Sequence, residues 1–312
     1  MIKAGIIGRD PNFNEHLQAL NGITDLKMMG LFIPGNFKSD KFGEELLFFH
    51  SFNEMLKKCD ALLIINPVKD DISLIRKAIK NAKDIFLSGP GDHTIREANE
   101  IIKLSGEAGI ALHVARYARY NPSFRSCLPY AGDVRLINIS RGVLHRSENT
   151  RDAYAGSLVQ DADLILAFTS SKVKKISATS FPVEGTGNDM LSARIIFDTG
   201  TIANIQYNPF DEPGFHCMDI FQPSQKISID FINGEVTITR SVDNCNKSIL
   251  SVSKGNGFGH PVESELEVFV QKILNREKKL NDIEENYASF YLASEIQDKV
   301  QQASLFFSKQ VL

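Results

Sequence analysis

Short apolar runs alternate with amphipathic segments along the first third of the chain. The runs are apolar without a break, which is typical of strands buried on both faces of a parallel sheet. Such strands are predicted at residues 3–8, 26–33, 61–65, 85–87 and 110–114. Apolar residues at helical spacing predict helices between them, at residues 14–20, 52–58, 72–81 and 94–106. Thr94, followed by Glu97, predicts a capping box at the start of the last helix.

The pattern changes after residue 118. Helices are predicted at residues 122–131 and 161–170, with a strand at 134–140 before the second of them. Strand-like runs then follow without helices between them, at residues 174–181, 193–197, 202–207, 217–221, 227–231, 236–240 and 249–252. Turn signals at residues 198–200 and 233–234 predict hairpins, and helices at 262–274 and 283–305 close the chain.

These patterns predict an α/β protein of two domains. Residues 1–118 are expected to form a Rossmann-type, doubly wound parallel sheet, because strands and helices alternate there. Residues 119–312 are expected to form an α+β domain with a large, mostly antiparallel open sheet. An open sheet with an uncovered face usually finds a partner, so we also expect a homo-oligomer that associates through this second sheet.

Composition and charge exclude several classes of protein. The chain has 312 residues, of which 43% are hydrophobic, and a net charge of −3, which indicates a folded protein and no nucleic-acid partner. No apolar run approaches the roughly 20 residues that span a bilayer, and no signal peptide precedes the first strand. Four cysteines without C-x-x-C spacing indicate reduced thiols. Because the histidines also lack metal-ligand spacing, we expect a cytoplasmic protein without a metal site or a membrane partner.

Several short motifs occur in a characteristic order along nearly the whole chain. They are Gly5-Ile-Ile-Gly8 with His16-Leu17, Asp60 before Asn66-Pro67, Ser88-Gly89-Pro90, Thr94 to Ala98, Arg119-Tyr-Asn-Pro122 and Asp198-Thr-Gly200. Their order and spacing resemble those of the Gfo/Idh/MocA family, the glucose–fructose oxidoreductase and inositol dehydrogenase family. The resemblance implies an NAD(P)-dependent oxidoreductase that acts on a sugar, sugar acid or polyol.

The dinucleotide-binding turn departs from the family pattern. In the fingerprint G-x-G-x-x-G, only Gly8 remains, and it is followed by Arg9, while Asp10 and Phe13 occupy the other glycine positions. Asp10 adds a negative charge where phosphates should bind. Ile33 stands where the family has an acidic residue for the adenosine ribose. We therefore expect NAD or NADP to bind weakly or not at all.

The motifs that the resemblance assigns to catalysis are altered as well. In addition to the dinucleotide-binding turn, the resemblance implies that five further residues contact the cofactor: Asn66, Pro67, Ser88, Gly89 and Pro90. One of these five positions also has a catalytic role in the family. Gly89 replaces the family's lysine, which contacts the reacting hydroxyl. Gln160 replaces a histidine that exchanges a proton, and amides do not titrate near neutral pH. Asp163 matches the family's aspartate and is the remaining candidate base. The neighbouring Asp161 is either a second carboxylate or the cap of its helix.

Arginines gather at the start of the second predicted domain. Residues 116–151 hold seven arginines, no lysine and only two acids, Asp133 and Glu148. A guanidinium fits carboxylate or phosphate in a planar fork, so this stretch indicates a small, anionic substrate. Arg119, Asn121 and Arg141 are the candidate substrate-binding residues. The alternative is that several of these arginines pair with acids elsewhere on the surface.

Two functions from different classes remain open. The first is an NAD(P)-dependent oxidoreductase with a divergent cofactor site. The second is a non-catalytic member of the same fold that binds a ligand or a partner protein. The fold alone supports both, since a fold does not establish chemistry.

Overall fold

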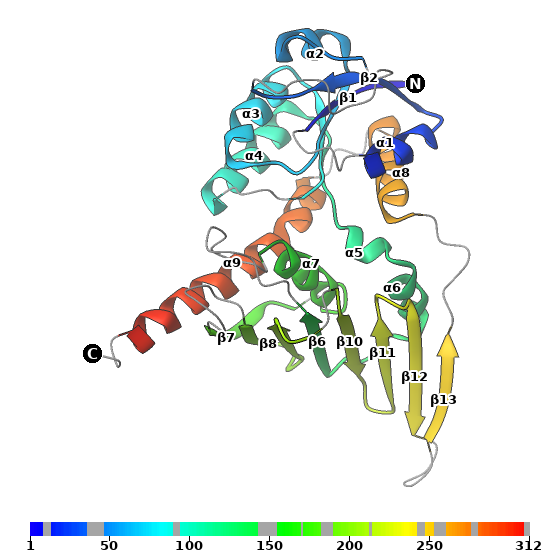
Figure 1. Ribbon diagram of the computed structural model, residues 1–312, viewed down its shortest axis with the longest axis vertical. Helices are drawn as coiled ribbons and strands as arrows, with labels where there is room; N and C mark the ends of the chain where they lie inside the picture. The colour runs from blue at the N-terminus through cyan, green and yellow to red at the C-terminus, as the bar shows by residue number, and fades with distance from the viewer. Residues whose placement is uncertain are drawn as a thin grey trace. The chain divides into compact units, whose positions relative to one another are not determined.

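The computed structural model describes residues 1–8, 14–35, 47–89, 94–142, 155–169, 171–181, 190–211, 214–241, 247–252, 260–275 and 280–308 (Figure 1). The chain divides into two compact units. The first comprises Met1–Tyr117 and Gly259–Ala288, and the second comprises Ala118–Phe258 and Ser289–Leu312.

A five-stranded parallel sheet with the order β2-β1-β3-β4-β5 forms the centre of the first unit. Its strands are β1 (Ile2–Ile7), β2 (Leu26–Phe32), β3 (Ala61–Ile64), β4 (Asp84–Leu87) and β5 (Leu112–Val114). Its helices are α1 (Asn14–Asn21), α2 (Phe52–Lys58), α3 (Ile72–Lys80), which follows the 3₁₀ turn η3 (Lys69–Asp71), and α4 (Ile95–Ala108). The predicted parallel sheet is therefore confirmed. Thr94 and Glu97 form the predicted capping box of α4.

A late segment of the chain completes this first unit. Helix α8 (Pro261–Leu274) packs against α1, and Figure 1 shows the two side by side. Val262, Leu266, Phe269 and Val270 of α8 are buried in the same apolar core as strands β1 and β3. The division into residues 1–118 and 119–312 is thus too simple, because the apolar face of α8 finds its partner surface in the first unit.

An eight-stranded sheet with the order β13-β12-β11-β10-β6-β9-β8-β7 forms the second unit. Its strands are β6 (Leu136–Gly142), β7 (Val173–Phe181), β8 (Met190–Phe197), β9 (Ile202–Asn208), β10 (His216–Phe221), β11 (Gln225–Asp230), β12 (Glu235–Ser241) and β13 (Lys247–Val252). All neighbouring strands are antiparallel except β6 and β9, which are parallel. This agrees with the predicted, mostly antiparallel sheet.

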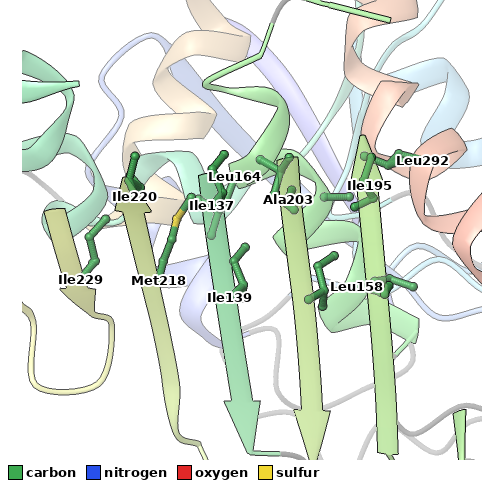
Figure 2. Close-up of a cluster of buried hydrophobic side chains, with 14 of the residues drawn as sticks. Ile137, Ile139, Leu158, Leu164, Ile195, Ala203, Met218, Ile220, Ile229 and Leu292 are labelled. Atoms are coloured by element: carbon green, nitrogen blue, oxygen red, sulfur yellow. The ribbon is translucent and has the colours of Figure 1, made fainter. Parts of the chain in front are cut away.

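The helices of the second unit are α5 (Tyr117–Tyr120), α6 (Pro122–Cys127), the 3₁₀ turn η4 (Leu128–Tyr130), α7 (Ala155–Leu166) and the later part of α9 (Leu280–Ser308). Helices α7 and α9 bury apolar side chains on one face of the sheet. Figure 2 shows Leu158 and Leu164 of α7 and Leu292 of α9 among isoleucines of the strands. Asp161 lies in the middle of α7, so it does not cap a helix that starts at residue 161.

Candidate functional site

The carboxyl edge of the parallel sheet brings together most of the predicted cofactor residues that the structure describes. Strands β1 and β3 are neighbours, although β2 lies between them in the sequence, so the strand order reverses here. Ligands of doubly wound sheets bind at such a reversal, outside the carboxyl ends of the strands. Gly8 follows β1, and its amide donates to the Phe32 carbonyl at 3.3 Å. Asn66 and the buried Pro67 follow β3.

Ser88, which follows β4, forms hydrogen bonds with residues at the end of β3. Its hydroxyl accepts a hydrogen bond from the Asn66 amide at 2.7 Å, and its own amide donates to the Ile64 carbonyl at 3.0 Å. Asn66 has a φ of 47°, a left-handed conformation that asparagine adopts more readily than most residues other than glycine. The edge is therefore a fixed, polar surface of backbone and hydroxyl groups.

Gly89 and Ile33, two described residues that depart from the motifs of the resembled family, differ in their surroundings. A Cβ atom added to Gly89 would have no neighbour within 4 Å, so open space lies where the family's lysine side chain begins. Ile33 is partly buried and packs against the core of the first unit, so it offers no acceptor to a ribose hydroxyl. Arg9, Asp10, Phe13 and Pro90 lie outside the described residues.

His113 of β5 and Glu265 of α8 form a buried acid–imidazole pair. The Nε2 atom of His113 is 3.0 Å from Oε1 of Glu265, and both side chains are almost fully buried. The same oxygen accepts the backbone N–H of Arg116 at 2.5 Å. The His113 ring stacks on Phe86, with the ring centroids 5.4 Å apart. Glu265 on α8 thus fixes the backbone position of Arg116, just beyond the strand.

In the second unit, Asp161 is the centre of a buried polar cluster. Arg141 donates to its carboxylate twice, from Nη2 to Oδ1 at 2.7 Å and from Nε to Oδ2 at 3.1 Å. The Tyr207 hydroxyl donates to Oδ2 at 2.5 Å, and Nε2 of His216 lies 3.0 Å from Oδ1. Arg141 on β6 is paired in the sheet with Tyr207 on β9 and with His216 on β10. The cluster therefore joins three adjacent strands to α7.

The charge of Asp161 is strongly favoured in this cluster. Burial by itself raises the pKa of a carboxyl group, but the Arg141 charge and the hydrogen bond with His216 lower the pKa of Asp161 to about 2. For Arg141, burial favours the neutral form, yet the Asp161 charge keeps the pKa of the guanidinium above its ordinary value. Asp161 and Arg141 are thus a permanent ion pair near neutral pH, and Asp161 is not a proton acceptor.

Asp163 forms a second pair with an arginine. Nε of Arg119 donates to Oδ2 of Asp163 at 2.7 Å, and Nη2 lies 3.4 Å from the Asp163 carbonyl oxygen. Asp163 is buried, whereas the Arg119 side chain retains 24% exposure. Gln160, on the same helix, is exposed. The side chain of Asn121 accepts the Ser123 amide at 2.9 Å and caps α6.

These contacts change the roles expected for the arginines. Arg141 was a candidate substrate ligand, but its guanidinium is occupied by Asp161 and only 16% of its side chain is exposed. Arg141 therefore pairs with an acid, as in the alternative for this stretch, but this acid is fully buried and does not lie on the surface. Local sequence patterns do not indicate His216 or Tyr207, because each reaches Asp161 only through strand pairing.

Two findings concern the described part of the chain as a whole. Among the described residues, no group of three or more His, Cys, Asp or Glu side chains could hold a metal ion. The helices of the described ranges include none that is long and apolar enough to cross a bilayer.

Comparison with known proteins relates the first part of the chain to one family. Residues 2–116 match the family model of Gfo/Idh/MocA, described as an oxidoreductase family with an NAD-binding Rossmann fold. The matched residues include the parallel sheet of the first unit, so this part of the chain is similar to the Gfo/Idh/MocA family. A similar protein is the UDP-N-acetylglucosamine 3-dehydrogenase of Acidithiobacillus ferrooxidans, which is 22% identical over 241 residues and aligned over 76% of each chain.

Solved structures share the fold of this protein over nearly its full length. The structure of the same Acidithiobacillus dehydrogenase has a TM-score of 0.85 at 18% identity and covers 96% of this chain and 98% of that chain. A dehydrogenase from Clostridium difficile has a TM-score of 0.82 at 19% identity, with 96% and 99% covered. Biliverdin reductase from Synechocystis sp. PCC 6803, solved with biliverdin and NADP+, has a TM-score of 0.78 at 12% identity, with 96% and 99% covered.

Proposed function

We propose that this protein is an NAD(P)-dependent oxidoreductase that acts on a CH–OH group of a sugar, sugar acid or polyol. The observation that carries the proposal is the carboxyl edge of the parallel sheet, where Gly8, Asn66 and Gly89 follow three adjacent strands. The match of residues 2–116 to an NAD-binding family supports a nicotinamide cofactor there. The relative that acts on UDP-N-acetylglucosamine supports a sugar hydroxyl as the reacting group.

The residues on this edge fit a dinucleotide. The backbone of Gly8 and the left-handed Asn66 lie at the strand reversal, and the space beside Gly89 is open where a Cβ atom would lie. A bound nicotinamide would accept or donate the hydride. Ile33 provides no acceptor for the adenosine ribose, and Asp10 would repel a pyrophosphate, so we expect weaker binding than an intact fingerprint provides.

Oxidation of a hydroxyl group also requires a residue that takes the hydroxyl proton. A base must take this proton as the hydride leaves, and Asp163 is the candidate from the sequence. In the structure Asp163 accepts a hydrogen bond from Arg119, so its carboxylate already has a partner. Asp163 also holds Arg119 in place, and the exposed part of this guanidinium can contact an oxygen of the substrate. We therefore expect slow turnover.

Calorimetric titration with NADH and NADPH tests the proposal directly. Binding of either cofactor, followed by substrate-dependent change in nicotinamide absorbance with a panel of sugars, sugar acids and polyols, supports an oxidoreductase. Ile33→Leu is the matched control for Ile33→Asp, because it keeps the apolar packing without adding an acceptor. If neither cofactor binds even to Ile33→Asp, the chain is a non-catalytic member of the fold instead.

We also propose a homo-oligomer that associates through the eight-stranded sheet. Helices α7 and α9 cover one face of this sheet, and the alternate residues of its strands keep intermediate exposure. A second copy of the chain would cover those residues. Light scattering on the purified protein measures this, and a monomer at all accessible concentrations would contradict it.

A further inference from the structure

Arg116 has a guanidinium that is not fully hydrogen-bonded in the described part of the chain. Its Nε and Nη1 atoms are shielded from water and have no hydrogen-bond partner in the described part of the chain. The backbone N–H of Arg116, by contrast, donates a hydrogen bond to Oε1 of Glu265. Shielding polar nitrogens without partners is costly, which indicates that an anion completes this site.

Arg116 and Gly89 follow the carboxyl ends of two adjacent strands. Val114 of β5 is paired with Leu87 of β4, and the amide of Ala115 donates to the Leu87 carbonyl at 2.8 Å. Counting two residues beyond the pair on each parallel strand leads to Gly89 and Arg116. Both positions therefore lie just beyond the carboxyl edge of the sheet. Gly89 has no side chain and has open space around its Cα, while Arg116 carries a guanidinium with two nitrogens that lack a hydrogen-bond partner in the described part of the chain.

We propose that Arg116 is the residue that binds a carboxylate of the substrate at this edge, beside the open space at Gly89. This inference rests on the proposed function, because it assigns the substrate class to the same site: a sugar acid in place of a neutral sugar. A lysine ammonium is a point charge that can contact a single hydroxyl. A guanidinium presents parallel N–H groups that match both oxygens of a carboxylate.

Matched ligands separate a carboxylate site from a general sugar site. D-galacturonate and D-galactose differ only in the group at C6, so their affinities, measured by calorimetry on the full chain, isolate the carboxylate. We expect galacturonate to bind at least tenfold more tightly than galactose. Arg116→Gln should remove this preference, whereas Arg116→Lys should retain only part of it, because the charge remains without the fork.

Arg135→Gln is the matched control, since Arg135 lies in the same arginine-rich stretch but is exposed and pairs with Asp133. It should bind galacturonate as the wild type does. Circular dichroism and NADPH titration of Arg116→Gln show whether the variant is folded and whether its cofactor site is intact. Unchanged NADPH affinity together with lost galacturonate preference is the expected result.

Three results would overturn the proposal. The first is equal affinity for galacturonate and galactose in the wild type, or no galacturonate binding at all. The second is an unchanged preference in Arg116→Gln. The third is a loss of NADPH binding in Arg116→Gln, with inorganic phosphate competing for the wild-type site, which would assign the guanidinium to a cofactor phosphate. If galacturonate binds through Arg116 but no nicotinamide binds, the proposed function fails and this inference stands.

Discussion

Replacing Asp161 by asparagine tests whether the buried cluster of the second unit stabilises the fold. The substitution keeps the shape of the side chain but leaves the Arg141 guanidinium with no neutralising charge. Removing one partner of a buried ion pair typically costs about 3–5 kcal/mol. The pKa of Asp161 falls from its ordinary value of 3.8 to about 2, and this difference alone corresponds to about 2 kcal/mol. We therefore expect a loss of about 2–5 kcal/mol in the free energy of unfolding.

Urea denaturation followed by far-UV circular dichroism is the suitable assay, because the chain has no tryptophan. Asp133→Asn is the matched control, since Asp133 also pairs with an arginine but is 59% exposed. An exposed pair contributes at most about 1 kcal/mol. The double variant Asp161→Asn/Arg141→Met removes both buried charges, and we expect it to lose less stability than the sum of the two single variants.

The pH dependence of the free energy of unfolding is a second test of the same cluster. The folded-state pKa of Asp161 lies below its ordinary value, so its contribution is complete above pH 3.8 and is lost as the pH falls toward about 2. The wild type should lose stability across this window, and Asp161→Asn should lose less. If Asp161→Asn is no less stable than Asp133→Asn, or if both proteins have the same acid dependence, the cluster does not stabilise the fold as argued.

Three further predictions follow from the site and the thiols. Ile33→Asp should tighten NAD binding relative to NADP and Asp10→Gly should tighten both, as measured by calorimetry; wild-type affinity equal to that of the variants would contradict this. Turnover of inositol, glucose and simple sugar acids should be slow, because the loss of acid–base assistance lowers a rate by about 10²–10⁴-fold. The double variant Gly89→Lys/Gln160→His should raise the rate only if the cofactor binds, and fast wild-type turnover would refute this. Burial raises the pKa of the Cys127 thiol to about 12, so iodoacetamide should label it in urea but not in the native protein, as peptide mass spectrometry would show.

The fold was predictable from the sequence because its signals are local. Unbroken apolar runs separated by amphipathic helices specify a parallel sheet, and Thr94 with Glu97 specifies the start of α4. Departures from a motif are equally local. The loss of a side chain at Gly89 and of a ribose acceptor at Ile33 can be read directly from the order of residues.

Tertiary structure alone decided the partners of the buried charges. Asp161 and Arg141 are twenty residues apart in sequence, and Tyr207 and His216 lie on two later strands, so only the pairing of β6, β9 and β10 unites them. The assignment of α8 to the first unit also depends on which apolar surface its buried face meets. Sequence patterns record which side chains are charged or apolar. Whether a guanidinium binds an internal acid, as in Arg141, or keeps its donors for a ligand, as we propose for Arg116, depends on which distant residues the sheet brings within a hydrogen bond's reach.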